Sequence, residues 1–270
     1  MRPSADELER FLHTLCRAAA RETLPHFRAP VAITNKLAEA GDFDPVTLAD
    51  QNGERAIRDI IGEHFPDHGI VGEEHGITLP NAECRWIIDP IDGTRAFISG
   101  LPLWGTLIGF SHGGNLVAGV MDQPFTRERY WTVGDGSFEQ VGDNKARTIN
   151  TSGVTELAQA TLMTTSPHLL LGQEDAGYFK LEQAVKMFRY GCDCYAYAMV
   201  AAGHIDLVVE SGLNIYDIAA LVPLIEQAGG VVTDWQGRPL HYSGGAGGKM
   251  QVIAAANTAL HEQALTVLQG

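Results

Sequence analysis

The first 25 residues place apolar side chains at helical spacing, on one face of a predicted helix. That face consists of Leu8, Phe11, Leu12, Leu15 and Ala19. Pro25 and Pro30 follow and end the pattern, because proline removes the backbone donor that a helix interior needs. A second helix is predicted from residue 47 to about residue 65, with isoleucines on its apolar face and Pro66 just beyond its end.

Short apolar runs separated by glycine-rich turns predict strands in the rest of the first half. They cover residues 69–74, 85–89, 103–110, 116–121 and 128–133. Residues 96–121 contain no Asp, Glu, Lys or Arg and are long enough to cross a bilayer, but Pro102 and six glycines interrupt them. We therefore expect buried strands joined by a turn at residues 112–115, not a membrane helix.

After about residue 145, predicted strands alternate with predicted helices. The strands are expected at 160–165, 204–209, 231–234 and 252–255, and the helices at 178–186, 194–202, 218–227 and 258–268. Such alternation is typical of layered α/β structures. We therefore expect an α/β (α+β) protein with two closely packed halves, residues 1–145 and 146–270, of which the second completes a site begun by the first.

The 270 residues include 33 acidic and 19 basic side chains, which gives a formal net charge of −14. An apolar share of 45% indicates a soluble globular protein. The acidic surplus argues against a nucleic-acid or membrane-surface partner, since both present negative charge. A phosphorylated small molecule is compatible with it if positive charge is supplied locally. No basic patch followed by an apolar run opens the chain, which predicts a cytoplasmic protein.

Several carboxylates stand directly after predicted strands or at the start of a predicted helix. They are Glu73, Glu74, Asp89, Asp92 and Asp217. Such positions commonly carry functional groups in α/β folds. Converging carboxylates repel one another unless they are protonated or bridged by cations, and Mg²⁺ suits oxygen ligands. The alternative is that these acids are separate turn and helix-capping residues, an interpretation as strong as the first for Asp217 taken alone.

Three segments carry a resemblance to a known family. They read Gly72-Glu73-Glu74, Trp86-Ile-Ile-Asp89-Pro-Ile-Asp92-Gly-Thr94 and Asp217-Ile-Ala-Ala. Together they resemble the inositol monophosphatase family of Mg²⁺-dependent, lithium-sensitive phosphatases, and the match extends from about residue 45 to about residue 230. The resemblance implies a layered α-β-α-β-α sandwich of the inositol monophosphatase/fructose bisphosphatase type, a homodimer, and roughly two to three Mg²⁺ ions per site.

The resemblance also implies roles for individual residues. The implied metal ligands are the side chains of Glu73, Asp89, Asp92 and Asp217 and the backbone carbonyl of Ile91. Glu73 and a pair formed by Thr94 and Asp50 would activate the attacking water, and the amides of Gly93 and Thr94 would hold the phosphate. This set suits hydrolysis of a phosphate monoester, because bound cations neutralise phosphate oxygens, acidify a water and stabilise the departing alkoxide.

A further set of residues is similar to the histidinol-phosphatase branch of that family. The segment Arg189-Tyr-Gly-Cys-Asp193-Cys-Tyr-Ala-Tyr197 is similar to the Gly-Asp-Cys-Tyr segment of this branch, and Arg95 and Tyr216 depart from the inositol branch. Asp193 and Glu210 match positions that face the leaving group, and Arg189 is a further predicted substrate contact. Carboxylates there suit L-histidinol phosphate, whose far end carries an ammonium and an imidazole.

Alternatives to this interpretation stay open at the level of sequence. Inositol hydroxyls also donate to carboxylates, so an inositol-1-phosphate, sugar-phosphate or nucleotide phosphatase is the nearest rival. A second alternative makes Asp193 only a helix N-cap. A third is a non-catalytic relative that binds metal and phosphate, which the presence of Asp50, Glu73 and Thr94 disfavours. Residues 32–43, which include Lys36, are a candidate segment to close over the metals, and residues 243–250 are predicted to form a flexible loop.

Overall fold

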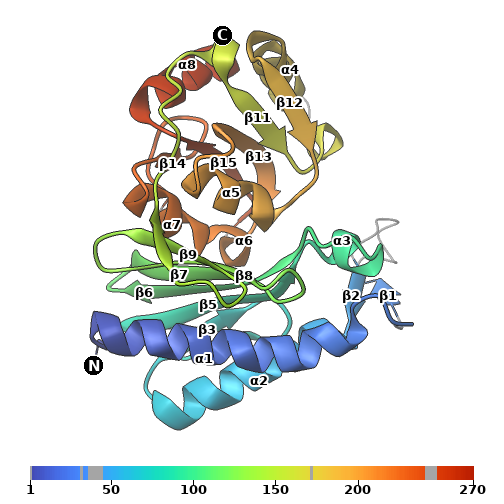
Figure 1. Cartoon of the computed structure of the whole chain (residues 1–270), viewed down its shortest axis with the longest axis vertical. Helices are drawn as coiled ribbons and strands as arrows, with labels where there is room; N and C mark the ends of the chain where they lie inside the picture. Colours follow the sequence, from blue (N-terminus) through green and yellow to red (C-terminus); the bar gives the residue numbers. More distant parts are fainter. Residues whose placement is uncertain (1, 31–32, 36–44, 171–172, 241–247) are drawn as a thin grey trace.

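The computed structural model describes residues 2–30, 33–35, 45–170, 173–240 and 248–270. The chain forms five layers in the order helices, sheet, helices, sheet, helices (Figure 1). The predicted α-β-α-β-α sandwich is therefore confirmed. Most of the candidate closing segment 32–43, including Lys36, lies outside the described residues, as does most of the predicted loop 243–250; from the former only β1 (Ile33–Asn35) is described, paired with β2 (Pro45–Thr47).

Helices α1 (Ala5–Thr23) and α2 (Leu48–His64) form the first layer, as the hydrophobic pattern predicts. The Ser4 hydroxyl caps α1 by accepting from the backbone N–H of Glu7. Thr47 and Asp50 form a capping box that starts α2. Apolar residues of both helices pack on one face of the larger sheet, in a core that includes the fully buried Trp86.

The larger sheet has eight strands in the order β10-β9-β8-β7-β6-β5-β3-β4. The bounds are β3 (Gly69–Gly72), β4 (Gly76–Thr78), β5 (Cys84–Asp92), β6 (Gly105–His112), β7 (Asn115–Gln123), β8 (Glu128–Val133), β9 (Ser137–Val141) and β10 (Arg147–Ile149). Neighbours are antiparallel except β3 and β5, which are parallel. The uncharged segment 96–121 thus contains β6 and most of β7, as predicted. No described helix is long and apolar enough to span a bilayer.

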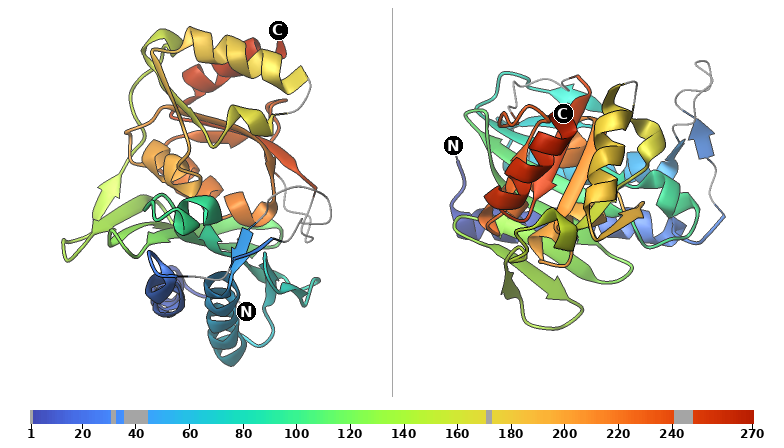
Figure 2. Two further views of the ribbon diagram at one scale, coloured as in Figure 1. Left: turned by 90° about the vertical axis from the view of Figure 1, so that its right-hand side faces the viewer. Right: turned by 90° about the horizontal axis from the view of Figure 1, so that it is seen from above.

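The smaller sheet has five strands in the order β12-β11-β13-β15-β14. The bounds are β11 (Thr161–Thr164), β12 (Met187–Tyr190), β13 (Leu207–Leu213), β14 (Val231–Thr233) and β15 (Met250–Ala255). Helices α4 (Gln173–Ala184) and α8 (Thr258–Gln269) lie side by side over its outer face (Figure 2). Helices α5 (Cys194–Ala201), α6 (Ile215–Ile218) and α7 (Leu221–Gln227) lie between the two sheets.

The sequence pattern missed some elements and misplaced others. Strands β4, β9, β10 and β12 were not predicted, because they are short and most of their residues are exposed or only partly buried. The helix predicted at 218–227 is two helices, α6 and α7, separated at residues 219–220. This break matters for the site, because the short helix α6 begins before the predicted start and carries Asp217 in its first turn.

The middle helices approach the larger sheet closely at two glycines, Gly109 and Gly119. A Cβ atom on Gly109 would lie 2.9 Å from the Ala219 carbonyl carbon, and one on Gly119 would lie 2.1 Å from the Ala220 carbonyl oxygen. Both contacts are with backbone, which cannot rotate away as a side chain can. The two glycines therefore let the connection between α6 and α7 rest directly on β6 and β7.

Replacing Gly119 with alanine is expected to lower the free energy of unfolding by about 1–3 kcal/mol, because the added methyl group overpacks this contact. Gly62→Ala on α2 is the matched control, since a Cβ there meets nothing within 4 Å. Alanine stabilises a helix interior by about 0.5–1 kcal/mol relative to glycine, so the control should gain stability. Urea unfolding measures both changes. A Gly119→Ala protein as stable as the parent would contradict the close packing.

Candidate active site

Asp89 and Asp92 come from the same strand, β5, and a β-bulge turns both side chains to the same side. Residues three apart on a regular strand point to opposite faces. Here Asp89 pairs with Leu107 and Asp92 pairs with Gly105, so three steps on β5 match two steps on β6. The extra residue is tolerated at Pro90, which has no N–H to lose from the ladder. The two carboxylates are therefore brought together by a bulge within a longer strand, and not by the predicted proline turn.

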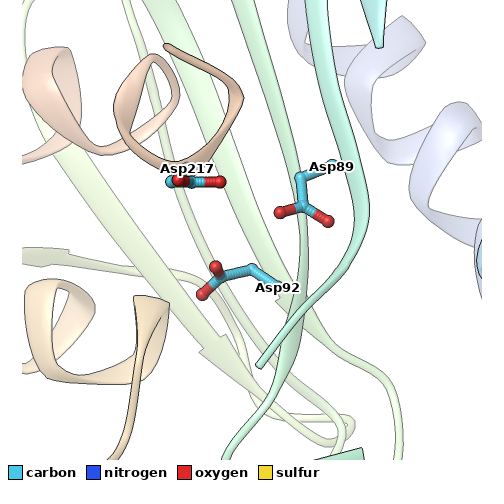
Figure 3. A group of neighbouring side chains, drawn as sticks. All are labelled: Asp89, Asp92 and Asp217. Atoms are coloured by element: carbon cyan, nitrogen blue, oxygen red, sulfur yellow. The ribbon is translucent and has the colours of Figure 1, made fainter. Parts of the chain in front are cut away.

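The third member of the cluster, Asp217, comes from the other half of the chain. It sits in the first turn of α6 and accepts a hydrogen bond of 2.6 Å from the backbone N–H of Asn214. The capping role considered for Asp217 is therefore real, but it does not exclude a second role. One carboxylate oxygen from each of Asp89, Asp92 and Asp217 lies within 4.8 Å of the others (Figure 3).

Hydrogen bonds from β5, α3 and α5 hold two of the aspartates and the neighbouring Ile91 carbonyl in place. Asp92 accepts a 2.6 Å bond from the backbone N–H of Cys194, the first residue of α5. Asp89 accepts a 3.0 Å bond from the backbone N–H of Ile91. The Ile91 carbonyl, a predicted metal ligand, accepts a 3.1 Å bond from the Thr94 hydroxyl. Backbone groups therefore fix the directions of these carboxylates before any ligand arrives.

The electrostatics of the cluster call for a cation. Burial raises the pKa of Asp89 and of Asp92 well above the usual range, and neighbouring carboxylates raise both pKa values further. Burial, together with the charge of Glu73, raises the pKa of Asp217 to about 7. Among the described residues, no arginine or lysine forms an ion pair with any of the three aspartates. A set of oxygen donors of this kind, buried at Asp89 and partly buried at Asp92 and Asp217, fits Mg²⁺.

The three residues predicted to activate water lie around this cluster. Glu73 follows β3, and its backbone N–H donates to the Ile88 carbonyl at 3.3 Å. Glu73 lines the same cavity as the cluster, as does Thr94. Asp50 is buried in α2, where Thr47 occupies its Oδ2 atom, while Oδ1 has no hydrogen-bond partner. The predicted pair of Asp50 and Thr94 is not hydrogen-bonded in the described structure, since the Thr94 hydroxyl donates to Ile91.

The main chain bends sharply at Gly93, between Asp92 and the short helix α3 (Thr94–Ile98). Gly93 has φ +84° and ψ 39°, a left-handed conformation that side chains disfavour. A Cβ atom there would also lie 2.8 Å from the Leu103 carbonyl oxygen. Gly93 and Thr94 line the cavity, and the first amides of a helix lack acceptors within it. This is the position predicted to hold a phosphate.

The cluster opens into a cavity of about 1720 Å³ between the two sheets, and two further acidic side chains, Asp193 and Glu210, also line it. Glu210 on β13 accepts from the Thr165 N–H at 2.7 Å and from the Tyr197 hydroxyl at 2.8 Å. Asp193 accepts from the Thr165 hydroxyl at 3.4 Å. Asp193 stands at the N-cap position of α5 but makes no side-chain capping bond, so the simple N-cap interpretation does not describe it. Both predicted carboxylates therefore face the cavity.

The structure also brings two charged residues to the cavity that were not among the predicted site residues. Arg95 and Lys249 line the cavity. The positive charge of Arg95 favours the ionised form of Asp193, and that of Lys249 favours the ionised form of Asp217. Only Arg95 had a sequence signal, its place directly after Gly93 and Thr94. Arg189, a predicted substrate contact, is exposed on β12 and is not among the described residues that line the cavity.

The layered fold and the acidic cavity are those of a metal-binding phosphatase. A model described as "Inositol monophosphatase family" matches residues 4–270 of the chain. The chain belongs to the inositol monophosphatase family and is a phosphatase of that family. The resemblance inferred from the three sequence segments is thereby confirmed.

Named relatives include enzymes with different substrates in their names. The chain is 40% identical to the "Bifunctional phosphatase IMPL2, chloroplastic" of Arabidopsis thaliana, over 98% of this chain and 77% of the relative. It is 34% identical to the histidinol-phosphatase of Streptomyces coelicolor, over 96% of both chains. Among solved structures, an inositol monophosphatase from Zymomonas mobilis matches the whole chain with a TM-score of 0.85 and 39% identity.

The raised pKa values predict how the metal-free protein responds to pH. Burial raises the pKa of Asp217 to about 7 and that of Asp50 to about 6, from a usual value of 3.8. For both carboxyl groups the pKa in the folded protein lies above that in the unfolded chain, so protonation favours the folded state. This contribution to the free energy of unfolding is fully present below about pH 4 and is lost as the pH rises to about 7. The expected slope is about 1.4 kcal/mol per pH unit for each group that stays protonated only in the folded state.

Urea unfolding between pH 4 and pH 8, in a chelator and then in excess Mg²⁺, measures this slope. Mg²⁺ should stabilise the protein more as pH rises, because it competes with the protons. The Asp217→Asn protein is the control. Its free energy of unfolding should depend less steeply on pH, because one of the two titrating groups is removed. Stability in the chelator that rises between pH 5 and pH 7 in both proteins would contradict the prediction.

Proposed function

We propose that the chain is a Mg²⁺-dependent phosphomonoesterase that hydrolyses L-histidinol phosphate to L-histidinol and phosphate in histidine biosynthesis. The observation that carries the substrate choice is a pair of carboxylates that line the cavity in addition to the predicted metal ligands. Asp193 and Glu210 line the same cavity as the metal-binding cluster, and each accepts a hydrogen bond from Thr165. A leaving group with an ammonium and an imidazole N–H supplies positive charge and further hydrogen-bond donors to these carboxylates.

The proposed mechanism places each side chain in one role. Glu73, Asp89, Asp92, Asp217 and the Ile91 carbonyl would hold roughly two to three Mg²⁺ ions, which supply charge neutralisation and acidify water. Asp50, Glu73 and Thr94 would accept and orient the protons of the attacking water. The amides of Gly93 and Thr94 would donate to the phosphate oxygens. Asp217, on α6, would hold an ion on the side of the leaving group, and Asp193 and Glu210 would orient the departing alcohol.

Phosphate release from a panel of esters tests the proposal. The purified protein should release phosphate from histidinol phosphate at least about tenfold faster than from inositol 1-phosphate, in line with one charged hydrogen bond. A chelator should abolish the release. Faster hydrolysis of inositol 1-phosphate would replace the proposal by the family alternative. Tight binding of Mg²⁺ and ester without any release would indicate a non-catalytic relative.

A broader phosphatase activity is a second candidate. It is favoured by the volume of the cavity, about 1720 Å³, and by the inositol-1-monophosphatase of Mesorhizobium japonicum, which is 35% identical over 73% of this chain. The same panel decides between the candidates, because a broad enzyme would hydrolyse sugar and nucleotide phosphates at rates close to that for histidinol phosphate.

We also propose that the chain forms a homodimer. Strand β12 lies at the edge of the smaller sheet and exposes Met187, Phe188 and Tyr190. An open strand edge with apolar side chains is a surface that proteins usually cover. Light scattering on the purified protein would measure the mass; a monomer at micromolar concentration would contradict the proposal.

A further inference from the structure

The turn that carries Glu73 is held by a buried carboxylate of helix α2. Glu54 is completely shielded from solvent. Its carboxylate accepts hydrogen bonds from the backbone N–H groups of Glu74 at 2.7 Å and of His75 at 3.1 Å. The space it occupies exists only because residue 72 is glycine, since a Cβ there would lie 1.9 Å from Glu54 Oε1. The two residues that follow Glu73 are therefore tied directly to α2.

Arg58 lies one helical turn further along α2 and connects the helix to strand β4. Its Nε atom donates to Glu54 at 2.6 Å, in an ion pair that is largely shielded from solvent. Its Nη1 atom donates to the Thr78 hydroxyl at 2.9 Å, and Nη2 donates to the Gly76 carbonyl. One guanidinium therefore links α2 to both ends of β4, and together with Glu54 it fixes the whole turn from residue 74 to residue 78.

The face of α2 that carries Glu54 and Arg58 also carries Asp50, one of the residues predicted to activate water. Asp50, Glu54 and Arg58 are spaced four residues apart, so they form one stripe along the helix. The charge of Asp50 acts on Asp89 of the cluster, whereas Glu54 and Arg58 make their hydrogen bonds outside α2 to the turn beyond Glu73. A rigid helix thus joins a predicted water-activating residue to the segment that carries Glu73. A buried ion pair contributes little to stability compared with apolar packing, so its presence here calls for another reason.

We propose that Glu54 and Arg58 are positioning residues, which hold the turn after β3 so that the Glu73 carboxylate meets the Asp89–Asp92–Asp217 cluster. This inference rests on the proposed function, because it requires Glu73 to be a metal ligand. Outer groups that orient metal ligands typically change metal affinity by about 10–100-fold when removed. Neither residue touches substrate, so the binding of the ester should not depend on them.

The test compares Arg58→Ala with Arg55→Ala. Arg55 is an exposed control on the same helix, and within the described part of the chain its side chain donates only to Asn52. Mn²⁺ binding, followed by the electron paramagnetic resonance of the free ion, gives a readout independent of turnover. The Kd for Mn²⁺ and the Mg²⁺ concentration for half-maximal activity should rise at least about tenfold in Arg58→Ala. The KM for the ester at saturating Mg²⁺ and both constants in Arg55→Ala should stay within about twofold.

Two further variants keep the test informative if Arg58→Ala fails to fold. Thr78→Val removes a single bond to Arg58 at an exposed site, and should shift the Kd for Mn²⁺ in the same direction by about threefold. Arg58→Lys should recover part of the loss, because an ammonium keeps the charge but cannot hold Glu54, Thr78 and Gly76 together. Unchanged Mn²⁺ binding in the folded variants would overturn the inference. Failure of the parent protein to release phosphate, with Mn²⁺ binding still dependent on Arg58, would overturn only the proposed function.

Discussion

Replacing Asp92 with asparagine is expected to reduce kcat by more than about a hundredfold, while the protein folds as before. Asparagine keeps the shape and can still accept the hydrogen bond from the Cys194 N–H, so the link between β5 and α5 survives. What it loses is the negative charge that would hold a cation. Loss of a direct ligand should exceed the roughly 10–100-fold effect of an outer group.

The same substitution should raise the stability of the metal-free protein. Burial and the charges of Asp193 and Asp217 raise the pKa of Asp92, so its ionised form is unfavourable when no cation is bound. The neutral amide removes that cost. Thermal unfolding in a chelator should therefore occur at a higher temperature in Asp92→Asn than in the parent, and added Mg²⁺ should raise it less.

Asp143→Asn, the same chemical change at an exposed aspartate, is the control for both measurements. It should leave kcat and the metal-free unfolding temperature unchanged. Near-normal turnover in Asp92→Asn would remove this residue from the catalytic cluster. Reduced stability in the chelator would show that its charge is satisfied within the protein.

Replacing Asp193 with asparagine is expected to change substrate preference more than overall activity. The value of kcat/KM for histidinol phosphate should fall by about 10–100-fold, because a charged hydrogen bond contributes about 1.5–3 kcal/mol. The value for inositol 1-phosphate should fall less than about threefold, since its hydroxyls can donate equally well to an amide oxygen. An equal loss with both esters would mean that Asp193 supports the fold of the site and does not select the substrate.

The pH dependence of the parent gives an independent check. Burial, together with the charge of Glu210, raises the pKa of Asp193 to about 6. Below that pH the free enzyme carries a neutral Asp193 and loses its attraction for a cationic leaving group. The ratio of kcat/KM for histidinol phosphate to that for inositol 1-phosphate should therefore fall as pH drops from 7 to 5, and this fall should be absent in Asp193→Asn.

The sequence predicted the fold class and the acidic cluster because both depend on local patterns. The helix of residues 5–23 has a clear apolar face, and Asp89 and Asp92 lie in one short motif. What local patterns could not show is the bulge at Pro90, because it is defined only by pairing with β6. The expectation of a turn was therefore wrong in form, although the two side chains meet as expected.

Contacts between distant segments set the limits of the sequence interpretation. Lys249 lines the cavity from the position just before β15, and it comes close to Asp217 only because the smaller sheet packs near α6. Arg189 lies in a suggestive motif, but β12 is an edge strand and exposes it. Short spacing along the chain therefore identified residues that share one turn or strand. It could not predict the direction of a side chain where that direction depends on a neighbouring layer.

The division of the cluster between two layers has a consequence for folding. Asp89 and Asp92 belong to a strand of the larger sheet, whereas Asp217 and the Cys194 N–H come from the helices beside the smaller one. A cation held by all three aspartates would therefore cross-link two parts of the protein that are far apart in the sequence. Neither part alone supplies enough ligands, so metal uptake should accompany the final docking of the sheets and should make unfolding more cooperative.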